Sequence, residues 1–368
     1  MTLWNEKRRI LITCARGTPG ILSGELQALR LPVRAMQETA LETEGSLADT
    51  VRLNLSLRTA QRILYLLDAF PAGQAQDLYR RLVKLPWERF IAADGYLSVT
   101  SSVKTDAVND TRFANVKTKD AIVDRIREKQ GRRPDSGPGR QGAVVHLHWE
   151  GDRCEVWLDT SGEPLSRRGY RKIPLEAPMQ ETLAAAVVLA TGWDGTVPLV
   201  NPMCGSGTLA IEGALIALGR APGILRQNFG FMHILGFDRP AFERQRDLLK
   251  KAARRKGDGR IVATDIRPEA VEAARQNART AGVEHLIEFG AEVFACFAGH
   301  FAHETRQGLR VVLVQVAQRA RVSQIVQVQL VPIVLLSPFH QLVIKSIREE
   351  DSLVCRRELP FGQDDSEP

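Results

Sequence analysis

The stretch NPMCGSGTLAIEGALIA, residues 201–217, carries the strongest fold signal in this 368-residue chain. Its glycines, Gly205 and Gly207, lie between the apolar run VPLV and a run with the composition of a helix. A glycine-rich turn from a strand into a helix lets a ligand approach the backbone and reach the free N–H groups of the helix N-terminus. The pattern therefore predicts a ligand-binding loop, with a purely structural tight turn as the alternative.

The segments around this loop alternate between helix and strand. In chain order we expect helix 179–193, strand 196–200, helix 208–219, an insertion at 219–257, strand 259–266, helix 268–282 and strand 285–289. Strands joined by helices in this order are typical of an open, mostly parallel sheet. The second half of the chain is therefore predicted to be a Rossmann-like α/β domain.

The first half of the chain mixes short strands and helices. We expect strand 8–17, helix 20–29, a longer amphipathic helix 48–70, strand 95–103, helix 118–134, a loop at 135–142 and a hairpin at 144–162. The hairpin should turn at Glu150–Gly151–Asp152, and Pro71 and Gly73 should close the long helix. This half is predicted to be an α+β unit.

The charge of the chain indicates a polyanionic partner. The formal net charge is +7 and the pI is about 9.3. Residues 112–140 carry nine Lys or Arg against four Asp or Glu, and LSRRGYRK (165–172) has four basic residues, no acid and a tyrosine. Basic groups interleaved with an aromatic suit phosphate contact and base stacking, so we expect nucleic acid as partner. A solvated basic surface is the alternative.

Other features argue against several classes of protein. No stretch of about 18 apolar residues is free of polar interruption, so we expect no membrane span. The first residues lack the apolar core of a signal peptide. The five cysteines are scattered without a CxxC pair, which disfavours a zinc site and a disulfide framework and indicates a reducing cytoplasm.

Three kinds of ligand compete for the glycine loop. A P-loop needs a lysine after its second glycine, and none is present. A dinucleotide site is compatible with Ala210 at the third glycine position, but Asn-Pro-Met-Cys before the glycines is unusual there. An adenosyl cofactor is favoured by Asp265, 58 residues beyond Gly207 at the end of the next strand, because an acid there accepts hydrogen bonds from ribose hydroxyls. A helix cap is the alternative role for Asp265.

These segments resemble the THUMP-domain class I methyltransferases of RNA, in particular those that methylate guanine N2 in large-subunit ribosomal RNA. The resemblance spans about residues 8–290, and its motifs are KDAIVDRIREKQGRRP, LDTSGEPLSRRGYR, APMQETLAAAVVLATGW, NPMCGSGTLAIEGALIA and ATDIRPEAVEAARQNARTAGV. It implies S-adenosylmethionine as the methyl donor. The implied cofactor residues are Asn201, Pro202, Cys204, Gly205, Gly207, Thr208, Asp265 and Ile266. The family usually has Asp-Pro where this chain has Asn201-Pro202.

The resemblance also implies that the N-terminal region binds structured RNA, in agreement with the basic stretch at 112–140. The residues that we expect to contact phosphate are Lys117, Lys119, Arg132, Arg133, Arg167 and Arg168. For each of them a solvated surface charge is the alternative. Neither a metal ion nor a membrane is expected as a partner.

The catalytic element of this family is missing from its usual place. The family uses Asn or Asp, then Pro-Pro and an aromatic, because a flipped base needs an acceptor for its amine and an aromatic face. This chain has no Asn after Asn277, no Tyr after Tyr170 and no Trp after Trp193. The acid expected after strand 285–289 is also missing. The catalytic residues are therefore unassigned. The stretch most similar to the catalytic element is Ser337–Pro338–Phe339.

The chain changes character from about residue 290, and nine valines occur between residues 311 and 334. Three interpretations are open: a frameshifted reading of the gene, an inactive RNA-binding descendant, or a divergent active enzyme. The abrupt end of the resemblance favours a frameshift. In that case exposed apolar strands would make the tail prone to aggregation.

We therefore predict four segments: a ferredoxin-like segment at 1–46, a THUMP RNA-binding domain at 47–158, a Rossmann-like cofactor domain at 159–290 and a divergent tail at 291–368. The leading functional hypothesis is cytoplasmic, S-adenosylmethionine-dependent methylation of guanine N2 in large-subunit ribosomal RNA. An inactive RNA-binding protein that retains the loop is the alternative. An NAD-dependent enzyme is disfavoured by the basic first half and the atypical loop.

Overall fold

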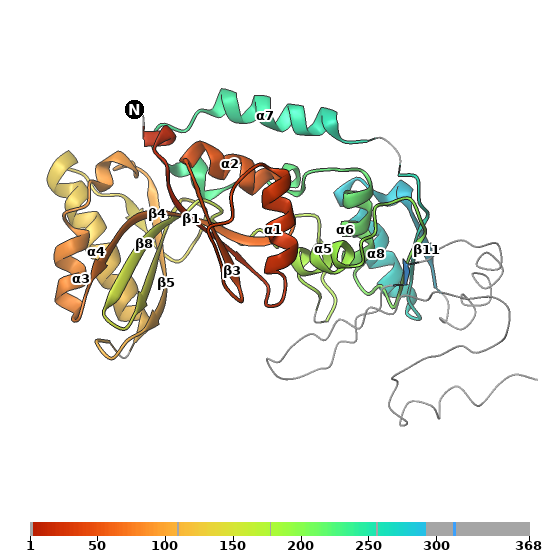
Figure 1. The fold of residues 1–368 in the computed structure, drawn as a ribbon, viewed down its shortest axis with the longest axis horizontal. Coiled ribbons are helices and arrows are strands. Elements are labelled where there is room, and N and C mark those ends of the chain that lie inside the picture. The colour runs from red at the N-terminus through yellow and green to blue at the C-terminus, as the bar shows by residue number, and fades with distance from the viewer. Residues whose placement is uncertain (1–2, 109, 177, 255–256, 292–311, 314–368) are drawn as a thin grey trace, which may run out of the picture. The chain divides into compact units, whose positions relative to one another are not determined.

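The computed structural model describes residues 3–108, 110–176, 178–254, 257–291 and 312–313 (Figure 1). All of them belong to one compact unit, Met1–Ile333. Within these residues the first half of the chain forms an eight-stranded sheet and the second half a four-stranded sheet. Each sheet is packed into its own apolar core.

The eight-stranded sheet has the order β2-β3-β1-β4-β8-β7-β5-β6. Its strands are β1 Arg8–Cys14, β2 Ala35–Met36, β3 Ala40–Gly45, β4 Ala60–Pro71, β5 Tyr96–Lys104, β6 Asp135–Ser136, β7 Ala143–Glu150 and β8 Arg153–Asp159. The helices of this half are η1 Leu3–Asn5, α1 Pro19–Ala28, α2 Leu47–Ser56, α3 Ala75–Leu82, η2 Trp87–Arg89 and α4 Thr111–Gln130. Helices α3 and α4 pack together, and α4 packs against β5 (Figure 1).

Local sequence signals explain several of these elements. The predicted hairpin is β7–β8, and Gly151 in its turn has φ +58°, a conformation that glycine adopts without strain. The predicted helix at 118–134 is α4, but it begins earlier, because the side chain of Asp110 accepts a hydrogen bond from the backbone N–H of Arg112. It ends at Gly131, which is left-handed at φ +69°. The predicted loop 135–142 contains the short strand β6.

The predicted helix 48–70 is confirmed only in its first part, which is α2, and is wrong for residues 60–70. Helix α2 ends at Ser56, Leu57 is extended at φ −72° and ψ 129°, and residues 60–71 form β4. Strand β4 pairs with β1 on one side and β8 on the other, so it is central in the sheet. A run of consecutive apolar residues fits a buried strand as well as a helix, and here the two neighbouring strands decide between them.

The four-stranded sheet is parallel and has the order β11-β10-β9-β12. Its strands are β9 Leu199–Pro202, β10 Ile261–Thr264, β11 Ile287–Gly290 and β12 Val312–Leu313. The helices of this half are α5 Glu181–Ala190, α6 Thr208–Ala217, η3 Pro222–Leu225, η4 Gly230–His233, α7 Arg239–Ala252, α8 Pro268–Ala281 and η5 Glu284–Leu286. In chain order the strands are arranged 3-2-1-4, which confirms the predicted Rossmann-like fold. Ligands of such sheets bind at the carboxyl ends of the strands where the order reverses, here beside β9.

The predicted segment boundaries remain predictions. The eight-stranded sheet continues across residue 46, since β1 and β3 pair with each other and β1 pairs with β4. Of the tail predicted at 291–368, only residue 291 and strand β12 lie among the described residues. Ser337–Pro338–Phe339 lies outside them. Within the described part of the chain, no helix is long and apolar enough to cross a membrane.

Candidate functional site

The glycine loop lies at the carboxyl edge of the parallel sheet, between β9 and α6. Gly205 and Gly207 are left-handed, with φ +54° and +81°, and Gly207 is the N-cap residue of α6. A Cβ atom on Gly207 would lie 2.8 Å from the Cβ of Ala274 on α8. A Cβ atom on Gly205 would have no neighbour within 4 Å. Glycine is therefore needed at 207 for helix packing, whereas the backbone at 205 borders open space that a ligand can approach.

Asp265 connects the loop to the end of β10. Its Oδ2 accepts the backbone N–H of Gly205 at 2.9 Å, and its Oδ1 accepts that of Arg267 at 3.1 Å. Helix α8 begins at Pro268 with Arg267 as its N-cap, so Asp265 is not the capping residue. An ionised carboxylate accepts about four hydrogen bonds, so Asp265 retains capacity for ligand hydroxyls beside these two backbone contacts.

Two large apolar side chains are exposed next to the loop. Ile266 is 67% exposed and Met203 is 56% exposed. Met203 also has φ +59°, and for a residue other than glycine this conformation costs roughly 1–2 kcal/mol. Backbone strain of this kind is concentrated at ligand sites. These side chains offer an apolar surface for a flat ring, and Met203 was not among the predicted site residues.

The remaining predicted cofactor residues are buried where β9 ends and α6 begins. Asn201 and Pro202 end β9 opposite Ala263 and Thr264 of β10, and Asn201 is buried. Thr208 is buried at the start of α6. Burial, reinforced by the charge of Asp265, raises the pKa of the Cys204 thiol to about 12, so it stays protonated at neutral pH. A buried thiol with a raised pKa is unreactive, which argues against a role for Cys204 as a nucleophile.

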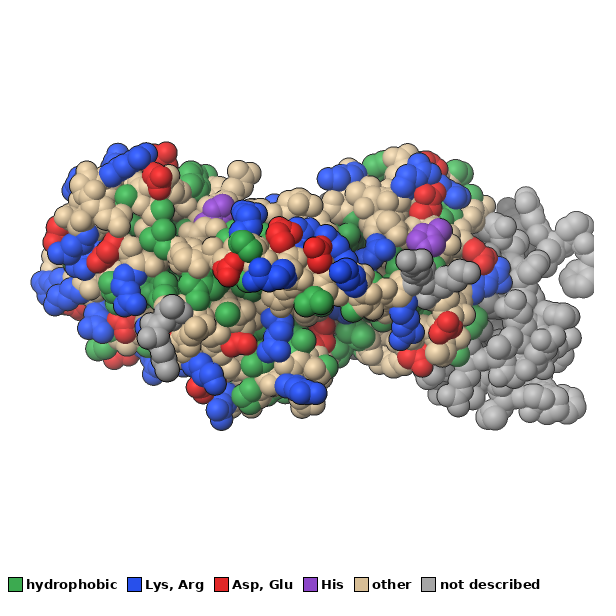
Figure 2. Space-filling model, turned by 90° about the horizontal axis from the view of Figure 1, so that it is seen from above, with side chains coloured by type: hydrophobic (Ala, Val, Ile, Leu, Met, Phe, Trp, Pro, Cys, Tyr) green, Lys and Arg blue, Asp and Glu red, His purple; other side chains and the backbone are tan. Residues whose placement is uncertain are grey.

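Most of the predicted RNA contacts lie in exposed or half-buried positions. Arg132 and Arg133 are exposed just after α4, and Lys117 and Lys119 are half-buried on α4. The Arg167 side chain is 74% exposed and pairs with Glu163 at 2.8 Å. Figure 2 shows Lys and Arg side chains across one face of the molecule, interspersed with Asp and Glu.

The prediction that Arg168 contacts a phosphate is corrected by the structure. Its side chain is only 1% exposed and cannot reach a phosphate in solution. Its Nε faces Glu212 Oε1 on α6 at 3.4 Å. Its other nitrogens donate to the backbone carbonyls of Leu165 and Arg58. Burial of an arginine requires such pairing, so Arg168 has a structural role.

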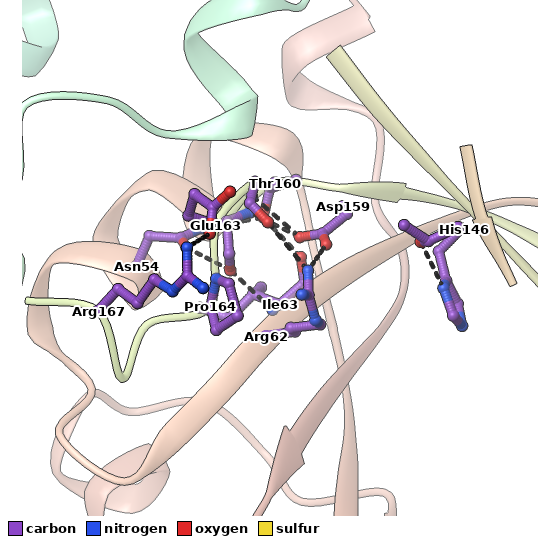
Figure 3. Close-up of polar contacts among 12 residues, drawn as sticks. Asn54, Arg62, Ile63, His146, Asp159, Thr160, Glu163, Pro164 and Arg167 are labelled. Carbon is purple, nitrogen blue, oxygen red and sulfur yellow. Dashed lines mark hydrogen bonds and ion pairs between the residues drawn. The ribbon is translucent and has the colours of Figure 1, made fainter. Parts of the chain in front are cut away.

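A second buried polar cluster lies where β8 ends (Figure 3). Arg62 on β4 donates to the carboxylate of Asp159, and Thr160 bonds to Asn54 at 2.9 Å. On β7, His146 lies 2.9 Å from the hydroxyl of Thr100. Burial, together with Arg62, His148 and Arg140, lowers the pKa of His146 to about 4. His146 is therefore neutral at physiological pH.

The stability of the protein should consequently fall as the pH drops below about 6.5. The unfolded chain binds a proton at His146 near its ordinary pKa of about 6.5, whereas the folded chain binds it near 4, so protonation between these values favours unfolding. Above pH 6.5 His146 is neutral in both the folded and the unfolded chain, so its protonation no longer lowers the free energy of unfolding. Urea unfolding at pH 7.0 and 4.5 should show that His146→Gln reduces the fall in unfolding free energy by about 2–3 kcal/mol. The same pH dependence in both proteins would contradict this assignment.

The fold and the loop together define a class. A parallel sheet of this order, with a glycine loop after its first strand and an acid after its second, is the architecture of α/β domains that bind nucleotide or adenosyl cofactors. Three family models match consecutive parts of the chain. They are the RlmL ferredoxin-like domain at 9–64, the THUMP domain at 72–159 and the RMKL-like methyltransferase domain at 168–302.

Curated relatives agree with these matches. The chain is 36% identical to "Ribosomal RNA large subunit methyltransferase K/L" of Psychromonas ingrahamii over 284 residues, which cover 76% of the chain and 37% of that protein. It is 36% identical over 290 residues to the protein of the same name from Syntrophotalea carbinolica, covering 76% of the chain and 40% of that protein. The chain thus spans about two fifths of the length of these relatives.

Solved structures agree as well. SMU.472, "a putative methyltransferase complexed with SAH", superposes with a TM-score of 0.70 at 28% identity, covering 77% of this chain and 75% of that one. A "predicted N6-adenine-specific DNA methylase" from Listeria monocytogenes gives a TM-score of 0.70 at 30% identity, covering 78% and 75%. The chain belongs to the family of THUMP-domain methyltransferases with an RMKL-like methyltransferase domain.

Proposed function

We propose that this chain is an S-adenosylmethionine-dependent RNA methyltransferase that acts on guanine N2 of large-subunit ribosomal RNA. The observation that carries the proposal is the glycine loop, tied to Asp265 at the carboxyl edge of a doubly wound sheet. It occurs in a chain whose curated relatives are named as ribosomal RNA large-subunit methyltransferases. We further propose that the protein acts in the cytoplasm.

The cofactor would be held by the eight residues named from the sequence, and the site fits it. Gly205 borders open space, Ile266 and Met203 expose apolar surface, and Asp265 offers acceptors for hydroxyl groups. When bound, S-adenosylmethionine supplies an activated methyl group. The residues of the chain bind the donor and orient it, and proximity then provides much of the rate enhancement.

The RNA would be bound by the first half of the chain, with the THUMP domain at 47–158 between the ferredoxin-like segment and the cofactor domain at 159–290. The proposed phosphate contacts are Lys117, Lys119, Arg132, Arg133 and Arg167. The match of residues 72–159 to the THUMP domain supports this assignment. Within the described residues, no group of three or more His, Cys, Asp or Glu is placed to hold a metal ion.

An inactive RNA-binding protein is the second candidate. It is favoured by the absence of a Pro-Pro pair from residues 278–368, where the family's catalytic tetrapeptide is expected.

Transfer of label from S-adenosylmethionine to RNA tests the proposal. The purified chain is incubated with labelled cofactor and unmodified ribosomal RNA, and label in guanine N2 is the expected result. Cofactor binding without transfer would favour the inactive protein, and absence of cofactor binding would overturn the proposal. Resequencing codons 285–368 tests the frameshift, because a confirmed reading frame removes it.

Charge reversal tests the RNA surface. Arg132→Glu combined with Arg133→Glu should weaken RNA binding by roughly tenfold and reduce the salt dependence of log K by about 2, one unit for each lost phosphate contact. Arg275→Glu with Arg279→Glu on α8 is the control, since it changes the net charge equally. Fluorescence anisotropy at several salt concentrations measures both effects. Equal weakening by the two pairs would show a general charge effect and contradict the assignment.

A further inference from the structure

The residues that join the two halves of the chain also contact the cofactor loop. We call Arg168–Ile173 the junction segment. Asn277, fully buried on α8, accepts the backbone N–H groups of Lys172 and Ile173 at its Oδ1, at 2.8 and 3.1 Å. Its Nδ2 donates to the carbonyl of Ile173 at 3.0 Å and to that of Ser206 at 3.1 Å. A side-chain amide makes at most about four hydrogen bonds, so Asn277 commits its full capacity to joining the junction segment to the loop.

The position of this contact is informative. Ser206 lies between Gly205 and Gly207, and its carbonyl is the group that Asn277 binds. Two glycines give a loop wide conformational freedom, which is lost when the loop is ordered. The loop therefore depends on neighbouring side chains to hold it in one conformation.

Arg171 makes a second contact between the junction segment and the loop. Its guanidinium donates to Thr208 Oγ1 at 2.9 Å and to the carbonyl of Met179. It also lies 3.5 Å from the carboxylate of Glu181. Thr208 is the first residue of α6, directly after the glycine loop, so this contact fixes the point where the loop enters the helix.

The other end of the junction segment is attached to the first half of the chain. Arg168 donates to the carbonyl of Arg58, which lies between α2 and β4. Arg168 and Tyr170 both reach Glu212 Oε1 on α6, at 3.4 and 3.1 Å. One short segment thus bonds to the RNA-binding half, to α6 and to the cofactor loop.

We propose that Asn277 and Arg171 are positioning residues of the methyl-donor site, which hold residues 205–208 in the binding conformation through the junction segment. The identity of the ligand rests on the proposed function. The tie, by which we mean the hydrogen bonds between the junction segment and the loop, does not depend on the identity of the ligand. Through the junction segment, the half of the chain proposed to bind RNA is connected to the loop proposed to bind the donor.

Hydrogen exchange of the full chain without ligand tests the tie. Asn277→Asp keeps the acceptor for Lys172 and Ile173 but loses both donors and places a carboxylate against two carbonyls. The amides of Gly205 and Gly207 should exchange about tenfold faster, while those of β10 stay unchanged. Gln276→Glu is the matched control, because it makes the same chemical change one residue away at an exposed position.

Thr208→Val provides a second variant should Asn277→Asp fail to fold. It keeps the shape of the side chain and removes the hydroxyl that accepts from Arg171. Faster exchange at Gly205 and Gly207 is again expected, and Thr208→Ser, which restores the hydroxyl, should behave as the unmodified chain. Unchanged exchange in both Asn277→Asp and Thr208→Val would overturn the inference.

Titration with S-adenosylmethionine separates this inference from the proposed function. Asn277→Asp, which lies outside the eight residues proposed to hold the donor, should bind the donor about tenfold more weakly, with RNA affinity unchanged. Faster loop exchange with unchanged donor affinity would overturn the positioning role. Faster loop exchange in a protein whose unmodified form binds no donor would overturn the proposed function and leave the tie between junction segment and loop standing.

Discussion

Gly207→Ala should lower the unfolding free energy by about 3 kcal/mol and weaken S-adenosylmethionine binding at least a hundredfold. The left-handed backbone at φ +81° costs a residue with a side chain about 1–2 kcal/mol. The new methyl group would lie 2.8 Å from the Cβ of Ala274 and 3.0 Å from its Cα. Because Ala274 belongs to a packed helix, the clash can be relieved only by moving α8, and overpacking of this kind costs a further 1–3 kcal/mol, roughly. A displaced α8 would also move Asn277, which donates to the carbonyl of Ser206, so the loop would lose the conformation that binds the donor.

Gly205→Ala is the matched comparison for this prediction. Gly205 is left-handed like Gly207, at φ +54°, but a Cβ atom there has no neighbour within 4 Å. Its substitution should therefore cost only the backbone contribution, about 1 kcal/mol. Urea unfolding of the two variants without ligand isolates the clash from any effect on binding. Equal loss of stability in both would show that contact with Ala274 is not what requires glycine at 207.

The contrast between these glycines shows what the sequence could predict. Two glycines between an apolar run and a helix predicted a ligand loop, and Asp265 at the end of the next strand was predicted beside it. The structure places the two together, with Asp265 bonded to the backbone of Gly205. Each of these signals can be recognised within a short stretch of sequence. The carboxyl ends of neighbouring parallel strands lie at one edge of the sheet, so the two signals could be expected to meet there. Which glycine is needed for packing and which for access depends on Ala274, about 70 residues away, and only the structure shows it.

The errors have the same origin. The run 60–71 has the apolar content of a helix, and its pairing with β1 and β8 made it a strand. Arg168 belongs to a basic stretch that predicts phosphate contacts. The residues that bury it, Arg58 and Glu212, lie 110 and 44 residues away in the sequence, so the stretch itself gives no sign of them. One local signal was present: Glu212 is the only charged residue of α6, an otherwise apolar helix. A lone buried charge requires a partner, and the partner is Arg168.

Arg168→Met should destabilise the protein by about 3–5 kcal/mol, the largest stability effect that we expect from a single change. Glu212 is completely buried, and without Arg168 it would keep, among the described residues, only the Tyr170 hydroxyl as a hydrogen-bond donor. The carbonyls of Leu165 and Arg58 would each lose a donor as well. An unpaired buried charge costs far more than the ion pair contributes in net terms, so replacing both partners should cost less than replacing one. The double variant Arg168→Met with Glu212→Leu should therefore recover about half of the lost stability.

The neighbouring arginine is the control for this prediction. Arg167 is exposed and its pair with Glu163 faces solvent, so Arg167→Ala should change the unfolding free energy by less than about 1 kcal/mol. The two positions should also separate in their effects on RNA. Arg167→Ala should weaken RNA binding and reduce its salt dependence in a protein of normal stability, whereas Arg168→Met should act through the fold. Urea unfolding and RNA titration of both variants measure this. If Arg168→Met weakened RNA binding at full stability, Arg168 would be a phosphate contact after all and its assignment as a buried structural residue would be wrong.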